Sequence, residues 1–121
     1  MIQHGRAPFL ECSTRGDRRF SAFCAYLRNG KSIEELYQAY KIFPGGVSGL
    51  TWREAKGRVA LNMEDCRIYY SRLWDMYIEQ NPDLLPVLHA ASGLSDMFGK
   101  KGHCCQATEL WRIRNRLDYD L

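Results

Sequence analysis

Carboxylates, cations and aromatic side chains occur in this 121-residue sequence at predicted loops and helix starts. Aromatic rings can stack on a nucleobase, cations can hold phosphate, and a carboxylate can act on a sugar. This combination of residue types fits a pocket for a nucleotide or a sugar phosphate. The residues concerned are Glu34, Asp96, Lys41, Lys56, Arg58, Lys100, Phe20, Phe23, Trp52 and Phe98.

The segment 31–41 would position Glu34. Ser32 and Glu35 have the spacing of a capping box, which predicts a helix that starts near Ile33. Glu34 would then lie in the first turn, where the helix dipole favours an ionised carboxylate. Gln38 and Lys41 are expected on the same side of this helix. The pattern is also typical of an ordinary amphipathic helix with a solvated acidic start.

Two further segments would carry other candidates. Residues 17–31 fit either helical spacing or a loop with a short strand, and we favour the loop and strand. A second capping box at 51–54 predicts a short helix that ends near Gly57. Because Gly57 lies between Lys56 and Arg58, backbone and charges could approach a ligand phosphate there. A glycine at this place is also a normal helix stop.

Helical patterns dominate the second half of the chain. The longest predicted helix covers about 64–80, with Asn62 as a possible cap and a wide apolar face that should be core. Asn81 would cap the next helix, with Pro82 at its first position. A last helix is predicted over about 105–117.

Less regular structure is expected elsewhere. Residues 92–104 are predicted to form a loop that holds Asp96, Phe98 and Lys100. Residues 1–16 should be irregular, with a strand starting near Phe9. We therefore predict a mainly α (α+β) fold, in which residues 1–121 form a single compact helical domain with a short N-terminal strand pair.

The composition is typical of a soluble globular protein, with 45% hydrophobic and 26% charged residues. No apolar run approaches the roughly 18 residues that a membrane span needs, and there is no signal-peptide pattern. Five cysteines is an odd number, and the histidines are scattered. We therefore expect no membrane, no disulfide scaffold, no zinc site, and reduced thiols in the cytoplasm.

The net charge of +3 is mild, but basic residues gather towards both ends of the chain. These ends could face one phosphate-bearing ligand or a nucleic acid. They are equally compatible with a solvated surface.

Several segments together resemble the NADAR family of N-glycosidases. Residues 32–41 meet its pattern Ser-x-Glu-x-x-Tyr-Gln-Ala-x-Lys, and 20–23 are similar to its Phe-Ser-Asn-Phe segment. Gly57-Arg58 resembles its Gly-Arg turn, 80–84 match its Gln-Asn-Pro-x-Leu junction, and 102–114 have the length of its closing helix. The chain departs from the pattern at three positions, which are Ala22 for Asn, Phe98 for Trp, and Cys104 for the closing Asn.

The resemblance implies a NADAR-like fold and carboxylate-assisted hydrolysis of a ribosyl–base N-glycosidic bond. Glu34 and Asp96 would be catalytic, because an ionised carboxylate stabilises an oxocarbenium-like sugar or activates water. The ligand would be a nucleotide or an ADP-ribose-type small molecule, either free or on modified DNA. No metal and no cofactor are implied. The residues assigned to substrate binding are Phe20, Ser21, Phe23, Tyr37, Gln38, Lys41, Trp52, Arg58, Phe98 and Lys100.

Two other functions remain open from the residues alone. The departures at Ala22 and Cys104 are compatible with a non-catalytic protein that sequesters a nucleotide on the same scaffold. The basic ends are compatible with a nucleic-acid-binding module, whose affinity would fall steeply with salt.

Overall fold

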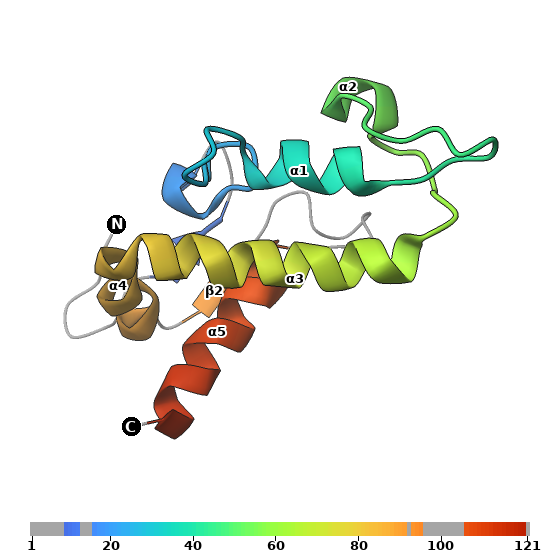
Figure 1. The fold of residues 1–121 in the computed structure, drawn as a ribbon. Helices are drawn as coiled ribbons and strands as arrows, with labels where there is room; N and C mark the ends of the chain where they lie inside the picture. Colours follow the sequence, from blue (N-terminus) through green and yellow to red (C-terminus); the bar gives the residue numbers. More distant parts are fainter. Residues whose placement is uncertain (1–8, 13–15, 92, 96–105, 121) are drawn as a thin grey trace.

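The computed structural model describes residues 9–12, 16–91, 93–95 and 106–120, and most of them are helical (Figure 1). The predicted helices are present with closely similar bounds, and the mainly α prediction is confirmed. The helices are α1 (Ile33–Tyr40), α2 (Trp52–Ala55), α3 (Met63–Gln80), α4 (Leu85–Ala90) and α5 (Gln106–Asp120), with the 3-10 turns η1 (Arg18–Phe20) and η2 (Pro82–Leu84).

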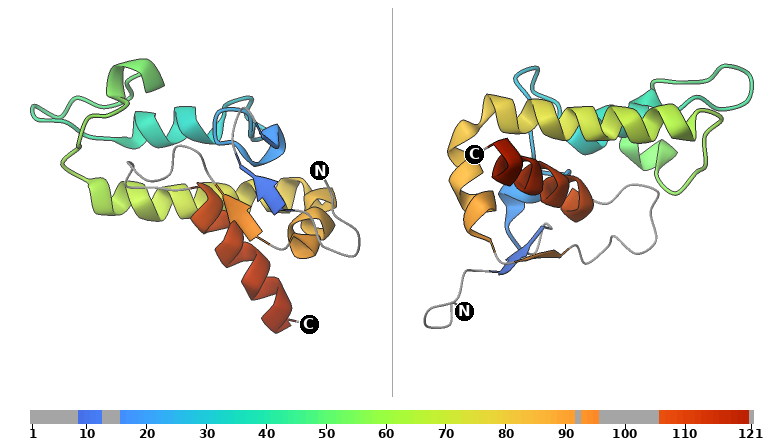
Figure 2. Two further views of the ribbon diagram at one scale, coloured as in Figure 1. Left: turned by 180° about the vertical axis from the view of Figure 1, so that it is seen from behind. Right: turned by 90° about the horizontal axis from the view of Figure 1, so that it is seen from below.

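The long helix α3 lies between the other helices. α1 runs along one side of α3, and α5 crosses on the other side at a steep angle (Figures 1 and 2). α2 covers the C-terminal half of α1, away from the end where α4 lies. The main core fills the space between α1, α3 and α5, and its largest fully buried side chains include Phe20, Ile33, Leu73, Trp74, Leu88, Leu110 and Ile113.

The strands join the N-terminal part of the described chain to the segment that precedes α5. β1 (Phe9–Glu11) pairs in parallel with β2 (Gly93–Ser95), with Leu10 opposite Leu94. The prediction of an N-terminal strand pair is therefore corrected, because the partner of β1 comes from the segment predicted as loop. Parallel strands need a long connection, and here the chain from η1 to α4 supplies it.

The strand predicted within residues 17–31 is not present. Residues 22–24 form turns after η1, and only an isolated antiparallel bridge joins Tyr26 to Ser32 across the turn at 28–30. Gly30 has a φ of +81°, which glycine adopts without strain. This segment therefore consists of tight turns and one isolated bridge rather than a strand.

Both predicted capping boxes are confirmed, whereas the two asparagines hold their predicted cap positions without a capping bond from the side chain. Ser32 and Glu35 bond reciprocally at α1, and Thr51 and Glu54 do so at α2. Asn62 occupies the N-cap position of α3, but its side chain makes no capping hydrogen bond. Its amide instead accepts from the backbone N–H of Ile42 at 2.8 Å and donates to the Tyr40 carbonyl at 3.0 Å. This side chain therefore connects the end of α1 to the start of α3.

Asn81 differs from the prediction in the same way. Its side chain makes no capping hydrogen bond to the following turn and donates to the Tyr77 carbonyl at 2.9 Å. Pro82 does occupy the start of η2, as predicted. Asn81 therefore ends α3 and also occupies the N-cap position of η2, where its backbone carbonyl accepts from the Leu84 N–H at 3.0 Å without a cap from its side chain.

Candidate functional site

The turn at 21–24 brings Phe23 next to the start of α1. The Ala22 carbonyl accepts from the Glu34 backbone N–H at 3.0 Å, and the Ala22 N–H donates to Gln106 Oε1 at 2.6 Å. The Ser21 hydroxyl accepts from the Phe23 N–H at 3.3 Å. The turn is thus fixed to both α1 and α5, and Phe23 projects from a constrained backbone.

Glu34 and Gln38 form a hydrogen-bonded pair on one side of α1. Gln38 Nε2 donates to Glu34 Oε2 at 2.6 Å. Glu34 is half-buried, and Gln38 is only 4% exposed. Among the residues that the structure describes, nothing donates a hydrogen bond to the buried Gln38 Oε1. An unpaired buried amide oxygen is costly, and such groups often mark functional positions.

The surroundings of Glu34 act on its ionisation in opposite directions. Burial raises the pKa of the Glu34 carboxyl above its ordinary value, because desolvation disfavours the charged form. The hydrogen bond from Gln38 and the nearby charges of Lys56 and Lys41 oppose this rise in pKa. A carboxyl group tuned in this way is a candidate for acid–base or electrostatic chemistry.

A cation whose charge acts on this carboxylate lies against two aromatic rings, and we call Phe23, Trp52 and Lys56 the aromatic–cation cluster. The rings of Phe23 and Trp52 meet edge to face, with centroids 5.3 Å apart. Lys56 Nζ lies 5.0 Å from the Phe23 centroid and 5.6 Å from that of Trp52. The ammonium is thereby held above π faces while its charge reaches Glu34. The cluster can offer flat apolar surface together with a positive charge.

Lys56 is the residue that the family pattern left without a role. It is exposed at the end of α2. Its position next to Gly57 was the one feature of the sequence that indicated a role in binding. The edge contact between Phe23 and Trp52, which comes from segments far apart in sequence, could not be read from spacing.

Lys41 is buried and serves the fold. It is 4% exposed, and its ammonium donates to the Ala55 carbonyl at 3.2 Å and to the Arg58 carbonyl at 2.9 Å. The same ammonium lies 5.5 Å from the Tyr37 ring centroid. Lys41 therefore ties the end of α2 to α1, and this use competes with the predicted phosphate contact.

Other predicted binding residues lie away from Glu34 or in the core. Phe20 and Tyr37 belong to the main core, and Ser21 is fully buried within its turn. Arg58 is exposed, and its guanidinium lies 4.1 Å from the Phe43 ring centroid. Asp96, Phe98 and Lys100 lie outside the described residues. The structure thus brings together Glu34, Gln38, Phe23 and Trp52 from the predicted set, with Lys56 added.

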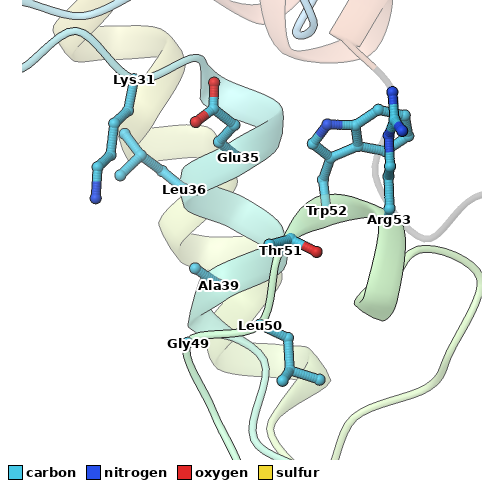
Figure 3. A pocket seen from close by; sticks show the side chains of 9 residues that line it. All are labelled: Lys31, Glu35, Leu36, Ala39, Gly49, Leu50, Thr51, Trp52 and Arg53. Carbon is cyan, nitrogen blue, oxygen red and sulfur yellow. The ribbon is translucent and has the colours of Figure 1, made fainter.

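A separate groove of about 440 Å³ runs along a neighbouring face of α1 (Figure 3). One wall is α1, and the other is the extended segment that leads into α2. Figure 3 shows Trp52 and Arg53 on one side, with Lys31 across α1 from them. The lining residues are Lys31, Glu35, Leu36, Ala39, Gly49, Leu50, Thr51, Trp52 and Arg53.

Among the residues that the structure describes, no group of three or more His, Cys, Asp or Glu side chains could hold a metal ion. None of the helices in this part of the chain combines the length and the hydropathy that crossing a bilayer requires.

Fold and site together define a small, mainly helical protein with a half-buried glutamate, a buried amide and an aromatic–cation cluster. No family model, no curated protein and no solved structure matches the sequence.

Proposed function

We propose that the protein is a NADAR-like N-glycosidase that hydrolyses a ribosyl–base bond in an ADP-ribose-linked or phosphoribosyl substrate. The observation that carries this proposal is the pair formed by Glu34 and Gln38. A half-buried carboxylate, held by an amide whose oxygen has no partner within the described part of the chain, is suited to a ligand that supplies the missing donor.

The chemistry assigns Glu34 the central role. Breaking an N-glycosidic bond develops positive charge on the sugar, and an ionised carboxylate close to that charge stabilises it or activates the attacking water. Gln38 would hold the carboxylate in position. Phe23 and Trp52 offer surface for a base, and Lys56 offers a charge for a phosphate.

A non-catalytic nucleotide-binding protein is the second candidate, and the electrostatics of Glu34 favour it. Burial raises the pKa of this carboxyl, so that ionising it costs more than ionising an exposed glutamate, whereas only the ionised form stabilises an oxocarbenium ion. In either protonation state the carboxyl can form hydrogen bonds with a bound nucleotide. The two candidates therefore differ in turnover rather than in binding.

Base release distinguishes them. Wild-type protein and Glu34→Gln would be incubated with ADP-ribosylated guanine DNA, nicotinamide adenine dinucleotide and ribosylamino-pyrimidine phosphates. Products would be measured by mass spectrometry, and binding by calorimetry. We expect release by wild type that falls at least about a hundredfold in Glu34→Gln, as for loss of a catalytic acid–base group.

A matched variant and a pH series sharpen this experiment. Glu79→Gln makes the same chemical change at an exposed position on α3 and should leave release unchanged. Release should increase with pH as the Glu34 carboxyl ionises, through a pKa above the ordinary value of 4.5. Tight binding of one compound without release by wild type would overturn the glycosidase proposal for it and favour sequestration.

A further inference from the structure

The groove beside α1 has an apolar floor and a preset shape. Leu36, Ala39 and Leu50 line it and are partly buried, and the Trp52 indole forms part of one wall (Figure 3). A volume of about 440 Å³ lies within the range of small-molecule sites. Its surface can therefore accommodate a flat apolar body of modest size.

Two capping boxes fix the walls of this groove. The α1 wall begins at the box formed by Ser32 and Glu35, and the opposite wall enters the box formed by Thr51 and Glu54. The Gly49 N–H also donates to the Ala39 carbonyl at 3.0 Å, which joins the walls directly. A preformed site does not have to order itself around its ligand, and this favours binding.

The charges of the groove favour an anion. Lys31 and Arg53 are exposed at its rim, and among the described residues neither pairs with a carboxylate. Glu35, the lining carboxylate, accepts from the Ser32 backbone N–H at 3.3 Å and from its hydroxyl at 3.2 Å. Two cations and one carboxylate leave one positive charge at the groove.

Arg53 sets this positive charge next to an aromatic wall. Its guanidinium carbon lies 5.3 Å from the Trp52 ring centroid, and Figure 3 shows the two groups side by side. A ring with an acidic substituent could contact the apolar floor while its acid group meets the guanidinium. Such charge-assisted hydrogen bonds are stronger than neutral ones.

We propose that this groove is a binding site for a small organic anion with a flat apolar body, such as an aryl carboxylate or aryl phosphate. The site does not depend on the proposed glycosidase function. It uses α1 residues on the face next to the pair of Glu34 and Gln38, and shares only Trp52 with the aromatic–cation cluster.

The test uses indole-3-acetate as the probe, with chemical shifts of the ¹⁵N-labelled protein as the readout. We expect shifts at the Trp52 indole N–H and at the backbone of Ala39 and Leu50. Indole-3-acetamide has the same ring without the charge and should bind about tenfold more weakly, because the Arg53 guanidinium then meets a neutral carbonyl acceptor in place of a carboxylate. Acetate alone should produce no saturable shift. Phenyl phosphate in a parallel titration shows whether phosphate replaces carboxylate.

Two variants test the site itself. Arg53→Gln should lower the affinity for indole-3-acetate about tenfold. Arg72→Gln makes the same change at an exposed position on α3 and should leave this affinity unchanged. Ala39→Leu retains helix propensity but fills the groove, so it should abolish the shifts. Equal binding of acid and amide, an unaffected Arg53→Gln variant, or shifts confined to the exposed Val59 and Leu61 would overturn the proposal.

Discussion

Glu34 is held in a state that costs stability when it is ionised. Its carboxyl lies beside a buried amide, and burial raises its pKa above that of an exposed glutamate. Residues that serve a ligand often lower the stability of the free protein, because their surroundings are arranged for the complex. The pH dependence of unfolding should reveal this cost.

We predict that Glu34→Gln stabilises the protein at pH 7 more than at pH 4. A carboxyl whose pKa is raised in the folded state favours folding below its unfolded value of about 4.5. That contribution is lost as the pH rises through the folded pKa. Urea unfolding of wild type and variant at both pH values measures the difference, and Glu79→Gln is the matched control. An equal effect at both pH values would contradict the raised pKa.

Among the elements, α2 depends on a side chain from α1. It has only four residues, and isolated helices of that length are unstable in water. Its start is held by the Thr51 capping box, and its end by the Lys41 ammonium, which bonds the carbonyls of Ala55 and Arg58. α2 in turn carries Trp52 and leads to Lys56, so Lys41 positions two of the three members of the aromatic–cation cluster.

We predict that Lys41→Met destabilises the protein by about 2 kcal/mol, because it leaves carbonyl groups without a donor at a largely buried place. Urea unfolding measures this loss. The exposed Lys31→Met serves as the control for the same chemical change and should stay within about 0.5 kcal/mol of wild type. Unchanged stability together with lost nucleotide binding would instead support a direct phosphate contact by Lys41.

At the scale of the whole molecule, one amide connects the two ends of the described chain. Gln106 at the start of α5 is 7% exposed, and its Oε1 accepts from the Ala22 N–H at 2.6 Å. Its Nε2 donates to the Cys12 carbonyl. Together with the pairing of β1 and β2, this amide closes the domain and fixes the turn that carries Phe23.

We predict that Gln106→Leu destabilises the fold by about 2–3 kcal/mol, since two buried backbone groups lose their partners. Leucine favours helix at least as well as glutamine, so α5 itself is not weakened. Thermal and urea unfolding measure the effect, with the exposed Thr108→Leu as the matched control on the same helix. Equal stability of Gln106→Leu and wild type would show that this connection is dispensable.

The helices were predictable from the sequence because their signals are local. Capping boxes at Ser32 and Thr51, the apolar face of α3 and the proline at residue 82 act within a few residues of one another. The same locality placed Glu34 and Gln38 on one side of α1, and their hydrogen bond confirms this.

Only the tertiary structure decided which side chains from distant segments contact one another. The pairing of β1 with β2, the edge contact of Phe23 with Trp52, and the burial of Lys41 join segments that no spacing rule connects. Asn62 was predicted as a cap because it precedes a helix, yet its amide reaches back to the end of α1. Local preferences define the elements, whereas burial and hydrogen-bond partners depend on how distant elements pack.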